Sequence, residues 1–190
     1  MSACASSVSR APGLESAPQM TFGANQQAGA ISLSLNEEAQ KIAATTVRFN
    51  QDTLLRLIRQ GLEQKSALTA TPDQALPSIE ILITSIRSRS AFNAVMFGFM
   101  AGDDHINGDV IVHSPQGKEM QHFTVSTSYA FGGLAGGQTD ARMGWLYETF
   151  AKHVVDELTG AKEAPSSEKN DTPPSDTEKP SPLETGAPMS

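Results

Sequence analysis

Two alternating segments joined by a tight turn constrain this fold more than any other feature. Apolar and polar residues alternate from His105 to His113 and again from Met120 to Tyr129. Alternation with a period of two is typical of a β-strand that is buried on one face. Between the two segments, 114–118 contains Pro and Gly, which set the dihedral angles of a turn. The sequence therefore predicts an antiparallel β-hairpin.

Three further strands or strand-like stretches precede the hairpin. Residues 79–86 are rich in β-branched side chains, which predicts a central strand. Shorter alternations at Met20–Phe22 and at Ile31–Leu35 predict a first strand.

Two amphipathic helices are expected. Asn50 can cap a helix in which Leu54, Ile58 and Leu62 fall at helical spacing. A second helix is expected from Thr139 to about Leu158, with Gly160 as its stop.

The predicted order is β-α-β-β-β-α, which indicates an α+β fold, a small two-layer α/β sandwich with a mixed sheet and two helices on one face. This domain is expected to span 19–160. The Ser, Ala, Pro and Gly of 5–18 predict a flexible tether, so 1–18 is assigned to a processing-site remnant and tether. The Pro, Ser, Glu and Lys of 161–190 predict a disordered tail.

The single cysteine, Cys4, follows two small residues in Ser2-Ala3-Cys4. Small residues before a cysteine are what lipoprotein processing requires, so we interpret Cys4 as a lipidation site for a diacylglycerol and palmitate anchor. The basic and apolar regions of a signal peptide are expected upstream of Met1. Ala5 after the cysteine favours sorting to the outer membrane of a Gram-negative cell. The alternative is an ordinary thiol on a frayed cytosolic terminus.

Composition excludes several function classes. A net charge of -7, with no clustered Lys and Arg, argues against a nucleic-acid partner. One cysteine excludes an intrachain disulfide and any C-x-x-C metal or redox site. No G-x-S-x-G motif is present, and no cofactor motif is complete. We therefore expect no catalytic residues, no cofactor and no metal site.

Two apolar segments that contain glycine lie outside the predicted elements, at 91–102 and 129–137. One interpretation is a joint apolar surface that docks a partner or touches lipid. The other is a core plug, or a strand with a bulge and a loop. Arg87 and Arg89 close the central strand, where they can clamp an acidic partner group or keep the strand end solvated. The candidate partner-binding residues are Phe92, Met96, Phe97, Phe99, Met100, Phe131, Leu134, Arg87 and Arg89.

Three polar features are candidate ligand sites. The loop Gly132–Gly137 precedes a helix, where backbone amides bind anions, but it lacks the Lys-Ser/Thr ending of a P-loop. Asp103-Asp104-His105 holds three metal-ligating side chains in a row, although a solvated turn explains them better. His113 and His122 are expected to face each other across the hairpin.

The residues also resemble a known family. A capped helix, an Ile-rich strand, the glycine-bearing segment 89–102, a Pro-x-Gly turn and the Gly-Gly-x-x-Gly-Gly loop before a closing helix resemble uncharacterised bacterial lipoproteins catalogued as a domain of unknown function. Such proteins look similar to small α/β periplasmic domains of outer-membrane lipoproteins that activate penicillin-binding proteins. The resemblance implies binding and not catalysis.

The expected function is therefore a non-catalytic lipoprotein on the periplasmic face of the outer membrane. It would be bound to the membrane through its lipid anchor and act as an accessory or adaptor for an envelope protein complex. Two alternatives remain: a small-ligand or anion-binding module that uses Gly132–Gly137, and a subunit of a homo-oligomeric envelope assembly.

Overall fold

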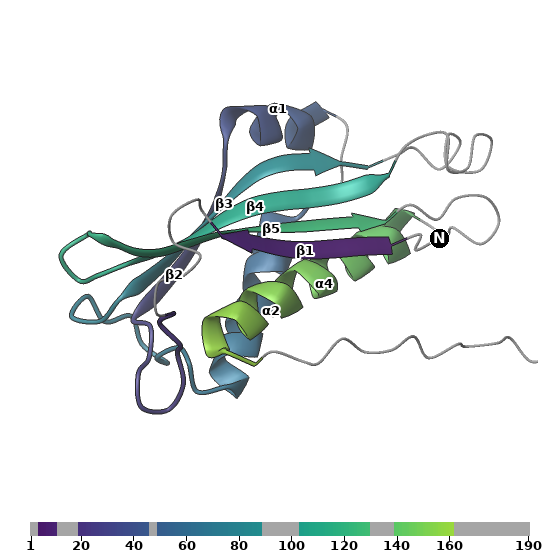
Figure 1. Cartoon of the computed structure of the whole chain (residues 1–190). Coiled ribbons are helices and arrows are strands. Elements are labelled where there is room, and N and C mark those ends of the chain that lie inside the picture. The colour runs from purple at the N-terminus through teal and green to yellow at the C-terminus, as the bar shows by residue number, and fades with distance from the viewer. Residues whose placement is uncertain (1–3, 11–18, 46–48, 89–102, 130–138, 162–190) are drawn as a thin grey trace, which may run out of the picture.

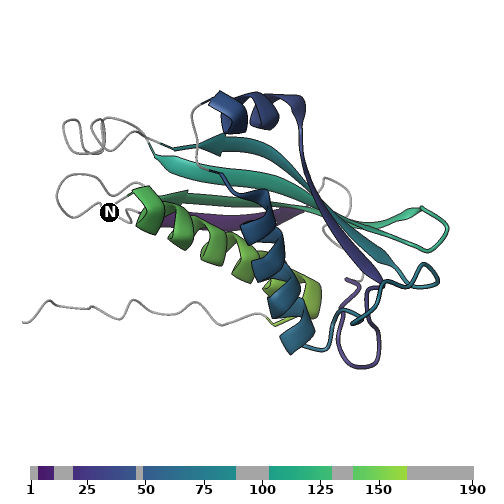
Figure 2. The same ribbon diagram turned by 180° about the vertical axis from the view of Figure 1, so that it is seen from behind.

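Five strands form one mixed sheet in the computed structural model, which describes residues 4–10, 19–45, 49–88, 103–129 and 139–161 (Figure 1). The elements in chain order are β1 (Cys4–Arg10), β2 (Ala30–Leu35), α1 (Glu37–Thr45), α2 (Gln51–Gln64), β3 (Ser78–Arg87), β4 (Asp104–His113), β5 (Glu119–Tyr129) and α4 (Thr139–Thr159). Figures 1 and 2 show α2 and α4 together on one face of the sheet. The predicted α+β sandwich is confirmed.

The strand order across the sheet is β1-β5-β4-β3-β2. Every neighbouring pair is antiparallel except β2 and β3, which are parallel. Parallel neighbours need a long crossover connection, and here the chain passes through α1 and α2 between the two strands. The sheet is therefore mixed, as predicted.

The hairpin of β4 and β5 forms where the alternation placed it. Ser114 donates its backbone N–H to the Lys118 carbonyl at 2.8 Å, and Gly117 donates to the Ser114 carbonyl at 2.8 Å. Gly117 has a φ of 79°, a left-handed conformation that glycine adopts without steric cost. Every second residue of β4 is buried against the helices, from Asp104 to Val112.

The two predicted helices supply the second layer. Asn50 caps α2 through its side chain, which accepts a hydrogen bond from the Thr53 backbone N–H at 2.8 Å. The backbone N–H of Asn50 donates to the Tyr147 hydroxyl of α4 at 2.8 Å, which ties the start of α2 to α4. Burial raises the pKa of that tyrosine above 10.0, and its bond to Asn50 acts in the opposite direction.

Apolar side chains from both helices and from one face of the sheet make a single core. Burial of this apolar surface is the main force that holds the two layers together. The largest fully buried side chains are Phe123, Phe150, Leu54, Ile58, Leu62, Ile79, Ile81, Ile83, Ile86, Ile106, Leu146 and Leu158.

Two local elements differ from the sequence-based expectation. Met20–Phe22 forms no strand; instead the Phe22 backbone N–H donates to the Leu158 carbonyl at 2.8 Å. An additional helix, α1, begins after Asn36, whose side chain accepts from the Ala39 backbone N–H at 2.8 Å. Figures 1 and 2 show α1 apart from α2 and α4, beside β3, and its main contacts are with β3 and β2.

The prediction of a flexible tether is wrong for Cys4–Arg10. These residues form β1, which pairs with β5 along the edge of the sheet. The Arg10 guanidinium binds the Glu157 carboxylate of α4 at 3.0 Å, and Ser6 and His153 are hydrogen-bonded at 2.7 Å. Val8 packs against the core. These long-range contacts order a strand whose composition is polar. The rest of the predicted tether, 11–18, and the tail beyond 161 lie outside the described residues.

Candidate functional site

Strand register brings the predicted lipidation residue to one end of the sheet. Cys4 is opposite Tyr129, Tyr129 is opposite Asp104, and the next β4 residue, His105, is opposite Arg87. We call this end, formed by Cys4, Arg87, Asp104 and Tyr129, the Cys4 end. The turn at 114–118 lies at the opposite end of the same strands.

Both apolar segments that contain glycine join the fold at the Cys4 end. The first connects β3, which ends at Arg87, to β4, which begins at Asp104; the second connects Tyr129 to α4. The candidate residues within these connections lie outside the described residues: Arg89, Phe92, Met96, Phe97, Phe99, Met100, Phe131 and Leu134. The loop Gly132–Gly137 lies outside them as well. Of the predicted partner-binding residues, Arg87 is described, and it is exposed.

A buried ion pair joins the start of β4 to α4 at the Cys4 end. The Arg142 Nε of α4 is 2.7 Å from the Asp104 Oδ2 of β4, and the two side chains are only 2% and 0% exposed. The prediction of a solvated turn at 103–105 is therefore wrong for Asp104. Strand alternation turns this side chain toward the helices, where an unpaired charge would be very costly, and α4 supplies the matching cation.

Asp103 and His105 point to the other face of the sheet. His105 Nδ1 lies 3.6 Å from Asp103 Oδ1, and its Nε2 lies 3.0 Å from the Ser85 hydroxyl of β3. Hydroxyl, imidazole and carboxylate follow one another in the order found in serine hydrolases. However, 3.6 Å is longer than a hydrogen bond between the imidazole and the carboxylate.

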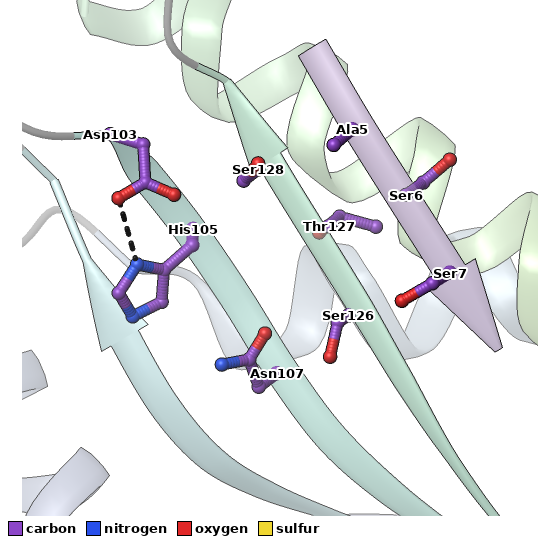
Figure 3. A pocket seen from close by; sticks show the side chains of 9 residues that line it. All are labelled: Ala5, Ser6, Ser7, Asp103, His105, Asn107, Ser126, Thr127 and Ser128. Carbon is purple, nitrogen blue, oxygen red and sulfur yellow. Dashed lines mark ion pairs between the residues drawn. The ribbon is translucent and has the colours of Figure 1, made fainter. Parts of the chain in front are cut away.

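A shallow pocket of about 270 Å³ lies beside His105 on this open face (Figure 3). Residues from β1, β4 and β5 form its wall, which is polar and apolar in about equal parts, and none of the described lining residues is Lys or Arg. The described lining residues are Ala5, Ser6, Ser7, Asp103, His105, Asn107, Ser126, Thr127 and Ser128. Ser85 is not among them, so the serine nearest the imidazole does not face the pocket. The wall suits hydrogen bonds to a neutral polar ligand better than it suits an anion.

The remaining histidines of the hairpin do not face each other, contrary to expectation. The register places His122 opposite Ile111 and His113 opposite Glu119. His113 Nε2 instead contacts Glu80 at 3.0 Å. The physical reason is the pairing register of the hairpin: with His122 opposite Ile111, a regular ladder already places His113 two residues out of line with His122, and the irregularity after Val112 shifts it one residue further.

His122 lies between two carboxylates, with Nε2 3.8 Å from Asp109 and Nδ1 3.6 Å from Glu119. Within the described residues, no set of three His, Cys, Asp or Glu side chains is arranged to hold a metal ion.

The comparisons with known proteins give a family. The model of a domain of unknown function (DUF4410) matches residues 17–133, more than half of the chain. The chain belongs to this family. The predicted resemblance to a family of unknown function is thereby confirmed. No curated protein matches the sequence.

Solved structures similar to this DUF4410 protein include a PelC dodecamer from Paraburkholderia phytofirmans, with 11% identity, coverage of 82% of this chain and 99% of that chain, and a TM-score of 0.46. A minor lipoprotein from Acinetobacter baumannii has 12% identity, coverage of 70% and 94%, and a TM-score of 0.38. The rare lipoprotein B from Shewanella oneidensis has 16% identity, coverage of 70% and 92%, and a TM-score of 0.36. The first of these proteins is described as a dodecamer, and the other two are described as lipoproteins.

Proposed function

We propose that this DUF4410 protein is an envelope lipoprotein, held at a membrane by acyl chains on Cys4, that serves as a non-catalytic accessory of an envelope complex. The carrying observation is the strand register, which places Cys4 at the same end of the sheet as the attachment points of both apolar segments. An anchor and a docking surface at one end would present the segments to neighbours at the membrane. In a Gram-negative cell this membrane is the outer membrane, on its periplasmic face.

Attachment through a lipid agrees with the helices that the structure describes. No described helix combines the length and the apolar character needed to cross a bilayer. Stable anchoring by lipid requires more than one acyl chain, because a single chain binds only weakly and reversibly. A diacylglycerol on the thiol, with a further acyl group on the amine, satisfies that requirement.

Metabolic labelling tests the anchor directly. Cells that express the gene together with its upstream coding region are fed radiolabelled palmitate, and the wild type is compared with Cys4→Ala. We expect label in the wild type and none in the variant, because Cys4 is the only thiol in the sequence. Label that persists in Cys4→Ala would show that the acyl chain is attached elsewhere.

The docking role is tested by replacing apolar residues at opposite ends of the molecule. Phe92→Ser and Phe97→Ser change the first apolar segment, while Met120→Ser changes the exposed methionine near the far turn, where 46% of the residue is exposed. After crosslinking in intact envelopes, we expect the first two variants to lose a wild-type adduct that Met120→Ser retains. Equal adducts in all three variants would remove the segment from the proposed interface.

The proposal that the protein is not an enzyme has a specific test in Ser85. A serine activated by His105 would react with a fluorophosphonate probe, since the oxygen of an activated hydroxyl attacks the phosphorus and displaces fluoride. We expect no labelling above that of Ser85→Ala. Labelling that disappears in both Ser85→Ala and His105→Gln would contradict the non-catalytic role.

A homo-oligomer is a second candidate, favoured by the exposed edge of β1. This strand closes one side of the sheet and contains no Pro or Lys, the residues that commonly protect an edge from pairing with another chain. Light scattering of the full chain tests it, and a purely monomeric mass at high concentration would count against it. The anion-binding alternative rests on Gly132–Gly137 and is tested by calorimetric titration with phosphorylated metabolites.

A further inference from the structure

An aromatic pair lies at the Cys4 end of the sheet. The rings of Tyr129 and Trp145 meet edge to face, with centroids 5.4 Å apart and planes at 61°. Both residues are partly exposed, although they pack against the core. Tyr129 is the residue that pairs with Cys4 across the β1 and β5 strands. The pair therefore lies directly beside the proposed anchor.

The beginning of β1 leaves no spacer after the cysteine. Pairing with β5 starts at Cys4 itself, and cross-strand neighbours have Cα atoms only about 5 Å apart. The headgroup layer on each side of a bilayer is roughly 5–7 Å thick. Acyl chains on Cys4 would therefore hold the end of the sheet at headgroup level, in contrast to the flexible tether that the sequence predicted.

Tyr and Trp are the side chains that membrane proteins place at this level, because each combines an apolar ring with a polar group that needs water or a headgroup partner. Arg87 is exposed at the same end of the sheet and suits the phosphate of a lipid headgroup. We propose, on the basis of the proposed lipid anchor, that the Cys4 end lies against the bilayer, with Tyr129 and Trp145 in the headgroup layer.

The sequence offers a clean experiment, since it contains one cysteine and one tryptophan. The full chain is coupled through Cys4 to a maleimide lipid in phosphatidylcholine vesicles whose acyl chains are brominated close to the glycerol. Bromine quenches the fluorescence of a nearby indole, so emission from Trp145 reports its depth. The matched control is Cys4→Ser with Gln116→Cys, which moves the single thiol to the exposed turn at the far end of the strands.

Coupling through Cys4 is expected to lower Trp145 emission roughly twofold relative to vesicles without bromine, because the indole then lies at headgroup level. Coupling through the far turn is expected to leave the emission unchanged. Equal emission with and without bromine in the Cys4-coupled protein would overturn the inference, as would equal quenching in both proteins. Far-UV circular dichroism of the control verifies that it is folded.

This result is independent of what the cell does to Cys4, because the coupling is chemical. Quenching together with absent palmitate labelling would sustain the membrane-facing surface and refute the anchored function. Palmitate labelling without quenching would sustain the anchor and refute the orientation.

Discussion

Replacing Arg142 with methionine is expected to destabilise the fold severely, because it leaves the Asp104 carboxylate buried without its cation. At the observed 2.7 Å, and with an effective dielectric constant of about 20, the attraction between the two charges is about 6 kcal/mol. Removing both charges from water costs several kcal/mol per ion, so the pair itself adds little net stability. Replacing Arg142 leaves the cost of burying the Asp104 charge and removes the attraction that offsets it. The expected loss is about 3–5 kcal/mol in the free energy of unfolding.

Urea unfolding followed by Trp145 fluorescence measures this loss, and α4 contains a matched control. Lys152 pairs with Asp156 at 2.6 Å on the same helix, but the lysine side chain is 50% exposed. Lys152→Met should cost only about 0.3–0.5 kcal/mol, as exposed pairs on a helix do. A double variant, Asp104→Leu with Arg142→Met, should regain most of the stability because no charge is left buried. The reasoning is refuted if Arg142→Met costs no more than Lys152→Met.

The remaining predictions concern four positions. A Cβ at Gly61 of α2 would come within 2.7 Å of Val155 Cγ2, so Gly61→Ala should lower the free energy of unfolding by about 1–3 kcal/mol. At Gly144 of α4 nothing lies within 4 Å of the added Cβ, so Gly144→Ala should raise it by about 0.5–1 kcal/mol. Urea unfolding measures both effects. If both alanines stabilised, the close helix contact would be wrong. Gln121 is buried, and within the described part of the chain neither of its amide atoms has a hydrogen-bond partner. Gln121→Met should therefore raise the free energy of unfolding by about 1 kcal/mol, and a loss would indicate a partner for the amide. Burial lowers the pKa of His153 below 6.5, so the native state binds fewer protons and stability falls as the pH drops below 6.5. The Tm of His153→Gln should therefore fall less than that of the wild type between pH 7 and pH 5; identical slopes would exclude His153 as a cause.

The elements that the sequence predicted well are those whose burial repeats at a fixed period. Ile79, Ile81 and Ile83 alternate in β3, and Leu54, Ile58 and Leu62 follow the helical period in α2; the structure buries all six side chains. In both cases one face of the element packs against the core, so the spacing of apolar residues along the chain indicates both the type of element and its buried face. The same holds for the hairpin and for α4.

The elements that the sequence missed depend on partners far away in the chain. β1 has one substantial apolar residue, Val8, and its order comes from pairing with β5 and from Glu157 of α4, which binds Arg10. No local pattern shows such contacts. A local signal did exist for α1, where Asn36 precedes two glutamates, because a capping side chain and early acidic residues are typical of a helix start.

The candidate site shows the same division. The sequence proposed Cys4, the two apolar segments and Arg87 as candidates. Strand order alone could have placed Cys4, Arg87 and the attachment points of both segments at one end once β1 was known. The ion pair could not be anticipated, because nothing near Asp104 in the chain indicates a cation 38 residues away. The sequence did not predict the aromatic pair either, because Tyr129 and Trp145 belong to different elements. Their proposed role follows only from the pairing of Tyr129 with Cys4.

The adjacent acids at the start of β4 explain why a buried charge is useful at this end of the fold. Alternation sends Asp103 to the open face beside His105 and Asp104 inward to Arg142. A slip of β4 by one residue would exchange the two faces, leaving Arg142 without a carboxylate and exposing the alternate apolar residues of the strand. Apolar burial specifies the register of β4 through many side chains that resemble one another. The ion pair of Asp104 with Arg142 forms in one register only. We infer that Asp104 and Arg142 fix the strand that enters from the first apolar segment against the helix that follows the second. Asp103→Asn should accordingly leave the stability within about 0.5 kcal/mol of wild type, because its side chain is 37% exposed. A loss as large as that of Arg142→Met would show that the acidic pair acts through its summed charge and not through register.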